Sequence, residues 1–341
     1  MLNHHHITRR AGRKLALLGA ASAAMAVAAS PASAAVDGSI YANGLNSPGG
    51  TVTMGSHTWV ADHVNGFCRL DKNAATGKFT INAATCNTAA ASPGQPTFDA
   101  ATNMVYVPDN STKGNAVYRL KFNPTTQTVS TSAALGASAI AAGTKPTATA
   151  LGPDGSLYVG SIRSGKILRI ANPATTGSPV QTVGVTSDGR GANGIAFANA
   201  SDGSLGASLY IAEGGGISEI ADATTCTGAC AATMTAIVPQ TLVNGKLIAW
   251  ETVDVVAAGP DTLYVAKWAP HDFGPKTTIV KYTISTGSAV DHSTSYVAPD
   301  GKLQPWTSVT DLALNPAGGL FVSHDPTNGG TNGALVSQIA G

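Results

Sequence analysis

The sequence predicts an all-β fold: a six-bladed β-propeller of four-stranded antiparallel sheets, with the ring closed by an N-terminal strand. The first supporting observation is a short motif that recurs six times. The second is the period-2 apolar pattern, bounded by Gly, Pro and Asp turns, around each copy. The third is that no convincing amphipathic helix follows residue 34. The length of 341 residues allows one large β domain or two ordinary ones.

Charged residues are unusually few in this chain. They make up 11%, against about 25% in an average soluble domain. The 20 basic and 19 acidic side chains give a formal charge of +1, so we expect no nucleic-acid partner. The hydrophobic content of 43% argues against disorder. No stretch after the first 34 residues is apolar enough to span a membrane.

The N-terminal segment has the three parts of a signal peptide in order. A positive region from Arg9 to Lys14 precedes an uncharged, Ala- and Leu-rich stretch from Leu15 to Ala29, and Ala32-Ser33-Ala34 follows as a cleavage site. The alternative is a short first helix of the domain. We therefore expect residues 1–34 to be a cleaved signal peptide and residues 35–341 to be a single propeller domain. The mature protein would then be secreted or periplasmic, by a Sec or twin-arginine route.

The recurring motif consists of aromatic or branched residues, then a small residue, then a polar one. Its aromatic positions lie 47, 52, 52, 54 and 57 residues apart, and six copies at that period predict radial repetition of a four-stranded sheet. The copies are Trp59-Val60-Ala61-Asp62, Tyr106-Val107-Pro108-Asp109, Tyr158-Val159-Gly160-Ser161, Tyr210-Ile211-Ala212-Glu213, Tyr264-Val265-Ala266-Lys267 and Phe321-Val322-Ser323-His324.

Similar segments surround each copy. In the third unit an apolar alternating run, Thr147 to Leu151, comes first, and the turn Pro153-Asp154-Gly155 leads into the motif. Another strand-like run, Lys166 to Ile170, follows it. The last unit offers only three strands before the chain stops. We expect Ser39 to Ala42 to supply the missing outer strand and close the ring, because closure removes exposed strand edges.

The four cysteines, Cys68, Cys86, Cys226 and Cys230, all lie in the part of the chain after residue 34. An even number in an exported chain favours two disulfides, and local pairing is the simplest assignment: Cys68 with Cys86, and Cys226 with Cys230. The alternative is a metal site. The Cys-x3-Cys pair has no partner pair at zinc-site spacing, which favours the disulfides.

Three segments resemble known propeller families. The segment Trp59 to Asp71 is similar to an NHL repeat, whose usual form is a strand ending YVAD, a turn with Asn, then RI; Pro153 to Val159 is similar to the same repeat. The segment Ala192 to Phe197 resembles a strand start of SMP-30-type sugar lactonases. The resemblance extends over about residues 46 to 339 and implies a six-bladed propeller.

In such a blade, the residues after the second strand lie at the same edge as the start of the inner strand, around the mouth of the central channel. Loops on a rigid scaffold are where function usually lies. Three tryptophans fall on this face and could stack on a sugar, peptide or planar ligand. Packing between blades is the alternative for them. The predicted ligand-binding residues are Trp250, Trp268, Trp306, Asp109, Arg163 and Lys267.

A divalent metal, Zn or Ca, is a further hypothesis for the same face. His63, His271 and His324 each stand beside an aspartate, and imidazoles with carboxylates suit Zn²⁺. The alternative is three solvated surface histidines. The resemblance adds precedents, because an NHL-type lyase holds zinc through three histidines and SMP-30-type enzymes hold a cation through Glu, Asn and Asp. Asn193 and Glu213 match part of the second set, but residues 46–58 contain no acid.

The sequence thus predicts binding of a small molecule, sugar, peptide or protein partner at the channel mouth. The alternative is a metal-dependent, lactonase-like hydrolase or a lyase at the same place, with Asp62 or Glu213 as the catalytic base. A structural scaffold with an empty channel is the third possibility. We expect a monomer.

Overall fold

The computed structural model describes residues 36–340 apart from 112–115, 136–139, 141–143, 176, 187–190, 201–203, 214–215, 227–229, 231–234, 237–240, 244–245, 249–250, 269–276 and 327–332. Residues from Ser33 onward form one compact unit. The expected signal peptide, residues 1–34, lies outside the described part. No helix in the described part is long and apolar enough to cross a bilayer.

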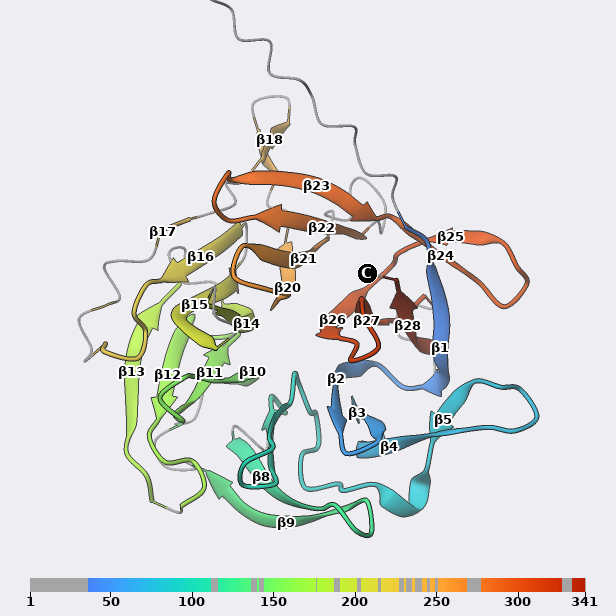
Figure 1. Cartoon of the computed structure of the whole chain (residues 1–341), viewed down its shortest axis with the longest axis horizontal. Helices are drawn as coiled ribbons and strands as arrows, with labels where there is room; N and C mark the ends of the chain where they lie inside the picture. Colours follow the sequence, from blue (N-terminus) through green and yellow to red (C-terminus); the bar gives the residue numbers. More distant parts are fainter. Residues whose placement is uncertain are drawn as a thin grey trace, which may run out of the picture. The chain divides into compact units, whose positions relative to one another are not determined.

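The unit is a ring of six antiparallel sheets, as predicted. Figure 1 shows the sheets arranged radially, with β2, β10, β14, β20 and β26 near the centre and β9, β13 and β23 at the periphery. The first three blades contain β2 (Pro48–Met54), β3 (His57–Asp62), β4 (Gly66–Lys72) and β5 (Phe79–Ile81); β6 (Thr97–Asp99), β7 (Met104–Asp109), β8 (Ala116–Asn123) and β9 (Thr128–Leu135); and β10 (Pro146–Leu151), β11 (Leu157–Ser161), β12 (Lys166–Ile170) and β13 (Val180–Val185).

The other three blades repeat this order. They contain β14 (Ala192–Asn199), β15 (Leu205–Glu213), β16 (Gly216–Ile220) and β17 (Thr235–Ala236); β20 (Glu251–Ala257), β21 (Thr262–Trp268), β22 (Thr277–Thr283) and β23 (Ser288–Ser293); and β26 (Val309–Leu314), β27 (Leu320–His324), β28 (Ala334–Ile339) and β1 (Gly38–Leu45). Outside the blades are the hairpins β18 (Thr241–Val243)–β19 (Lys246–Ile248) and β24 (Ser295–Val297)–β25 (Leu303–Pro305), and the 3₁₀ helix η1 (Ala83–Thr85).

The N-terminal strand closes the ring, as expected. β1 pairs antiparallel with β28, with Ser39 opposite Gln338 and Ile40 opposite Ser337. The same strand pairs in parallel with β5 of blade 1 and with β24. The Tyr41 ring stacks on Phe79 with centroids 4.4 Å apart. The first and last blades are therefore joined by hydrogen bonds and by aromatic packing, which leaves no free edge at the junction.

The apolar residues pack between blades. Each neighbouring pair of blades encloses its own buried cluster. The aromatic position of every motif copy lies on a second strand and is at most 8% exposed. Tyr158 packs edge-on against Phe197 of the next blade at 4.8 Å. The repeat is thus the core-forming strand of each blade. It recurs because each pair of neighbouring sheets must fill the same space between them with apolar side chains.

Both predicted disulfides are present. Cys68 bonds to Cys86, which ties β4 to the segment after η1, and Cys226 bonds to Cys230. Such bonds persist in oxidising compartments.

Candidate functional site

A β-bulge recurs on the inner strands where they approach the mouth. The register shifts between Pro48 and Gly50 in β2, and at the equivalent step in β10, β14, β20 and β26. In blade 2, Gly94 lies between the bridges Pro93–Asp109 and Gln95–Ala148. A bulge leaves one residue out of the ladder and re-aims its side chain. The bulge residues are Gly49, Gly94, Thr147, Asn193, Val253 and Thr310.

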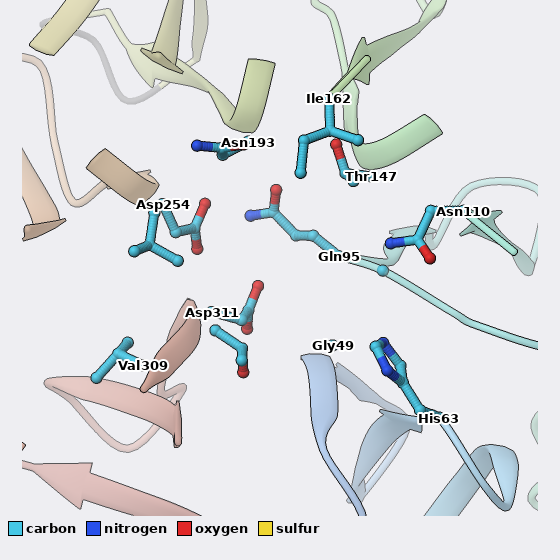
Figure 2. A pocket seen from close by; sticks show the side chains of 13 residues that line it. Gly49, His63, Gln95, Asn110, Thr147, Ile162, Asn193, Asp254, Val309 and Asp311 are labelled. Carbon is cyan, nitrogen blue, oxygen red and sulfur yellow. The ribbon is translucent and has the colours of Figure 1, made fainter. Parts of the chain in front are cut away.

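These six bulge residues all line one cavity of about 220 Å³. Because each comes from a different blade, the cavity is the mouth of the central channel. Figure 2 shows the lining side chains converging on the channel, with Gln95 reaching toward Asn193, Asp254 and Asp311. The remaining lining residues are His63, Gln95, Asn110, Ile162, Asp254, Val309 and Asp311.

Glycines give the channel its narrow mouth. A Cβ on Gly49 would lie 2.0 Å from the Pro93 carbonyl oxygen, and one on Gly94 would lie 2.0 Å from that of Thr147. Neighbouring inner strands approach too closely for any side chain there. At Gly194 a Cβ would lie 1.8 Å from Asp254 Oδ1, so this glycine makes room for the carboxyl group of the next blade.

Two buried carboxyl groups, 2% and 1% exposed, occupy the same place in neighbouring blades. Asp254 accepts from Leu312 N at 2.6 Å and from Val255 N at 2.8 Å. Asp311 accepts from Thr51 N at 3.1 Å through Oδ2, while its Oδ1 is buried with no partner. The two carboxyl groups lie close enough for each to shift the pKa of the other. The pair therefore links blades 5, 6 and 1 and leaves one oxygen, Asp311 Oδ1, unused.

Burial raises the pKa of both carboxyl groups. For Asp254 the pKa rises to about 7, with the backbone hydrogen bonds opposing the shift. The pKa of Asp311 is also raised, first by burial and then by the charge of Asp254. In the described part of the chain, no Lys or Arg side chain compensates the pair. Two neighbouring buried carboxylates repel each other, and protonation removes that repulsion. The pair therefore retains protons near neutral pH.

Two rings of residues surround the mouth. The outer ring consists of the residues that end or nearly end each second strand, where the sequence predicted the site: Asp62, Asp109, Ser161, Glu213, Lys267 and His324. The inner ring consists of the residues that follow each bulge: Gly50, Gln95, Ala148, Gly194, Asp254 and Asp311. None of the outer ring lines the cavity, whereas Gln95, Asp254 and Asp311 of the inner ring do.

The outer-ring aspartates hold their own loops together. Asp62 is fully buried and accepts from the backbone N–H groups of Asn46, Val64 and Asn65, and from Asn65 Nδ2. Asp109 accepts from Ala91, Ser92 and Ser111 in the same way. Neither carboxylate faces the cavity, so Asp62 occupies a position for shaping a loop and not one for taking a proton from a substrate in the mouth.

The predicted metal ligands are separated. His63 lines the cavity; its pKa is lowered by burial, which the charge of Asp62 opposes, and its ring bonds to the Pro93 carbonyl group. His324 is fully buried, bonds through Nε2 to Ser337 Oγ at 2.9 Å, and has a pKa lowered to about 3 by burial. Glu213 accepts from Ser218 Oγ at 2.5 Å; it lies opposite Ala192, next to Asn193, but does not line the cavity. His271 lies outside the described residues.

The tryptophans predicted to bind a ligand together lie in different environments. Trp306 is 0% exposed, stacks on Tyr296 at 5.2 Å and bonds through Nε1 to Ser293 Oγ at 2.9 Å. Its ring is packed between elements and is not open to a ligand. Trp268, half-buried at the end of β21, lies one residue beyond the outer ring. Trp250 lies outside the described residues.

The two remaining predicted binding residues lie off the cavity. Arg163 is exposed on the loop after β11. Lys267 is half-buried, and burial lowers its pKa against the opposing charge of Asp291. Of the site residues named from the sequence, His63 and Asn193 line the cavity.

Gln95, Asp254 and Asp311 are not among the residues predicted for the site. Asp311 lies within the apolar alternating run from Thr310 to Leu314, and Asp254 lies within β20, which has the same character, so the apolar pattern hides both carboxyl groups. The overlooked signal is an aspartate inside an apolar strand, at the same place in two consecutive repeats. A buried charge at that place needs a partner or a ligand.

Comparison with family models and with curated protein sequences finds no match. Solved structures do match. Regucalcin from Agrobacterium tumefaciens, a calcium-binding protein, is 14% identical with a TM-score of 0.56, over 90% of this chain and 97% of that one. A catalytically inactive virginiamycin B lyase from Staphylococcus aureus with quinupristin is 12% identical with a TM-score of 0.52, over 89% and 98%. A candidate gluconolactonase is 14% identical with a TM-score of 0.56, over 91% and 94%.

These likenesses show the fold alone, a six-bladed propeller. The calcium-binding relative raises the question of a cation at the same mouth. In the described part, no three His, Cys, Asp or Glu side chains are grouped to hold a metal. The lining offers three side-chain oxygens that accept no printed hydrogen bond, Asp311 Oδ1, Gln95 Oε1 and Asn193 Oδ1, whereas Ca²⁺ takes six to eight oxygens. The described residues therefore supply only part of the oxygen shell of a hard divalent cation.

Proposed function

We propose that this chain is an exported binding protein that holds a small polar ligand in the mouth cavity of its propeller. The observation that carries the proposal is a cavity lined from all six blades in which two buried oxygens, Asp311 Oδ1 and Gln95 Oε1, have no protein partner. Native proteins rarely leave such groups unpaired. A bound ligand would satisfy both.

The size of the cavity restricts the ligand. About 220 Å³ is below the ~300–1,000 Å³ of sites for drug-sized molecules. A compact polar molecule fits inside, and a larger one would rest partly on the rim. Trp268, near the mouth at the end of β21, would contact that outer part, as the sequence suggests.

Export is proposed from two features. The segment 1–34 has the pattern of a signal peptide, and the two disulfides favour an oxidising compartment.

Ligand-induced stabilisation tests the binding function. A panel of small polar molecules is screened by thermal unfolding, because a ligand at 100 times its Kd stabilises the native state by about 2.7 kcal/mol. Ile162, 40% exposed at the mouth, provides the site-specific variant. We expect Ile162→Trp to block the mouth and weaken binding at least tenfold without changing the Tm of the free protein.

The control is Val64→Trp, at an exposed position (69%) that does not line the cavity, and it should bind normally. Equal binding by Ile162→Trp would place the ligand elsewhere, and no stabilisation by any compound would refute the binding function.

The carboxyl pair favours a second candidate, a hydrolase or lyase that uses Asp311 as a general acid. A carboxyl group that keeps its proton near neutral pH can protonate a leaving group. The test is turnover of sugar lactones and cyclic peptides. An enzyme would lose at least 100-fold in kcat with Asp311→Asn, whereas a binding protein shows no turnover to lose.

A further inference from the structure

The floor of the mouth cavity is rich in hydrogen-bond acceptors that lack donors. Asp311 Oδ1 and Gln95 Oε1 are both buried and unpaired, and both residues line the cavity. Asp311 is 1% exposed, so water reaches its free oxygen poorly. Figure 2 shows the Gln95 amide reaching across the channel to the Asp254–Asp311 side. An acceptor left without a donor destabilises the empty protein, so the missing partner is a donor.

Three neighbouring side chains each use a donor elsewhere in the protein. Asn193 donates Nδ2 to the Thr252 carbonyl oxygen at 2.9 Å, which leaves its Oδ1 as an acceptor. Thr147 donates Oγ1 to the Ala192 carbonyl oxygen at 2.9 Å, and Thr310 donates to that of Pro48.

The side of the cavity formed by blade 2 differs from the floor because it offers a donor. Asn110 accepts from Ser92 Oγ at 2.6 Å, so its Nδ2 remains as a donor. The cavity therefore has an acceptor floor and one amide donor on the side of blade 2.

The charges of the residues that line the cavity also favour a ligand that donates hydrogen bonds. The titratable groups of the lining are His63, Asp254 and Asp311, and it contains no Lys or Arg. Burial lowers the pKa of His63, so this ring is neutral near pH 7. Burial raises the pKa of both carboxyl groups, and the lining holds no basic side chain that would oppose this shift. A cation placed beside the pair would compensate both carboxylates.

We propose that the ligand of this cavity is a small primary amine, whose ammonium group donates to Asp311 Oδ1, Gln95 Oε1 and Asn193 Oδ1 on the floor. An ammonium group has three donors and no acceptor, which matches three acceptors that lack donors. The inference rests on the proposed binding function and names its ligand class. The amine carries a polar group at its other end, which accepts from Asn110 Nδ2.

Matched pairs of ligands that differ only at the nitrogen test the amine directly. Isothermal titration compares ethanolamine with ethylene glycol, and glucosamine with glucose, at pH 7. We expect the amine of at least one pair to bind at least tenfold tighter than its neutral partner. We also expect proton release on binding, seen as a dependence of the heat on the buffer, because the cation lowers the pKa of the carboxyl pair.

Asp311→Asn is the decisive variant. Asparagine can still accept from Thr51 N, but its NH₂ group replaces the free acceptor oxygen. We expect the variant to weaken amine binding at least tenfold and to change binding of the neutral partner less than twofold. Gln95→Met, of similar size, removes a second acceptor outside the carboxyl pair and should weaken the amine severalfold, so the test stands even if Asp311→Asn folds poorly.

The outcomes separate the two proposals. Neutral partners that bind as tightly as the amines, with no effect of either variant, overturn the amine inference and leave the binding function intact. Calcium that binds tighter than every amine and depends on Asp311 also overturns it. If no compound of the wider panel binds, the proposed function fails, and the inference fails with it.

Discussion

The outer and inner rings at the channel mouth are both polar, yet their hydrogen bonding differs. Asp62 in the outer ring accepts four N–H groups of its own loops, all from neighbouring chain segments. Asp311 in the inner ring accepts one N–H group, from Thr51 of another blade, and keeps one oxygen unpaired. Asp62 is thus paired within the protein, whereas Asp311 keeps one oxygen that the proposed ligand would pair.

The difference shows that a conspicuous repeat identifies the parts that build the fold. Asp62 and Asp109, which end the first two copies of the motif, are hydrogen-bonding anchors of their loops. The inner ring changes from glycine to glutamine, alanine and aspartate around the channel. Variation on a constant scaffold is where specificity resides.

The largest expected effect comes from breaking the outer ring. Asp62→Ala leaves three backbone N–H groups and the Asn65 amide without their acceptor in a fully buried position. We expect a loss of about 3–4 kcal/mol of unfolding free energy, measured by urea denaturation. The control is Asp300→Ala, at an exposed ion pair with Lys302, which should cost less than ~0.5 kcal/mol. Similar losses for the two variants would contradict the role of Asp62.

The next effect tests the close approach within the inner ring. Gly194→Ala would place a methyl group 1.8 Å from Asp254 Oδ1 and displace that carboxyl group from Val255 N and Leu312 N. We expect a loss of about 2–3 kcal/mol, again by urea denaturation. Ligand affinity should fall as well, because the carboxyl pair moves. A variant with unchanged stability would mean that Gly194 and Asp254 are farther apart.

The carboxyl pair makes stability depend on pH. The pKa of Asp254 is about 7 in the folded protein and near 3.8 when unfolded. Between these values the folded state binds the extra proton, so its contribution is complete below about pH 3.8 and is lost as pH rises to about 7. The slope is at most about 1.4 kcal/mol per pH unit.

The pH prediction is checked by comparing wild type with Asp311→Asn in urea between pH 4 and 8. Other carboxyl groups, such as Asp71 with its lowered pKa, act in the opposite direction and cancel in the difference. The variant removes Asp311, the second carboxyl group with a raised pKa, and should therefore flatten the fall. Parallel curves for the two proteins would argue against coupling between the carboxyl groups.

The smallest effect concerns a bulge residue whose donor is already used. Thr147→Val removes the hydrogen bond from Oγ1 to the Ala192 carbonyl oxygen between blades 3 and 4. We expect a loss of about 1 kcal/mol of stability and less than a twofold change in ligand affinity. A large loss of affinity with normal stability would instead make the Thr147 hydroxyl group a ligand contact.

The propeller, its closing strand and both disulfides could be predicted from the sequence because each depends on local signals. Period-2 patterning, turn residues and cysteine spacing are all readable over short stretches, and Ser39 to Ala42 was the one strand left to fill the gap. The cavity depends on a bulge at one step of each inner strand. No propensity marks such a bulge, so the predicted mouth was shifted from the inner ring to the outer ring.

The burial of individual side chains is the second feature that the sequence does not predict. Trp306 and His324 are both expected at the mouth from the sequence, yet they pack against each other with ring centroids 4.9 Å apart. Whether an aromatic ring points into the wedge between blades or out of the mouth depends on its neighbours in space.

A crystal structure of the full-length protein with ethanolamine, or with the tightest-binding amine, tests the central claim most directly. The account predicts the ligand in the mouth cavity, with its nitrogen about 2.7–3.2 Å from Asp311 Oδ1 and within reach of Gln95. A ligand bound instead against the outer ring or on another face, with Asp311 Oδ1 still unpaired, would contradict it.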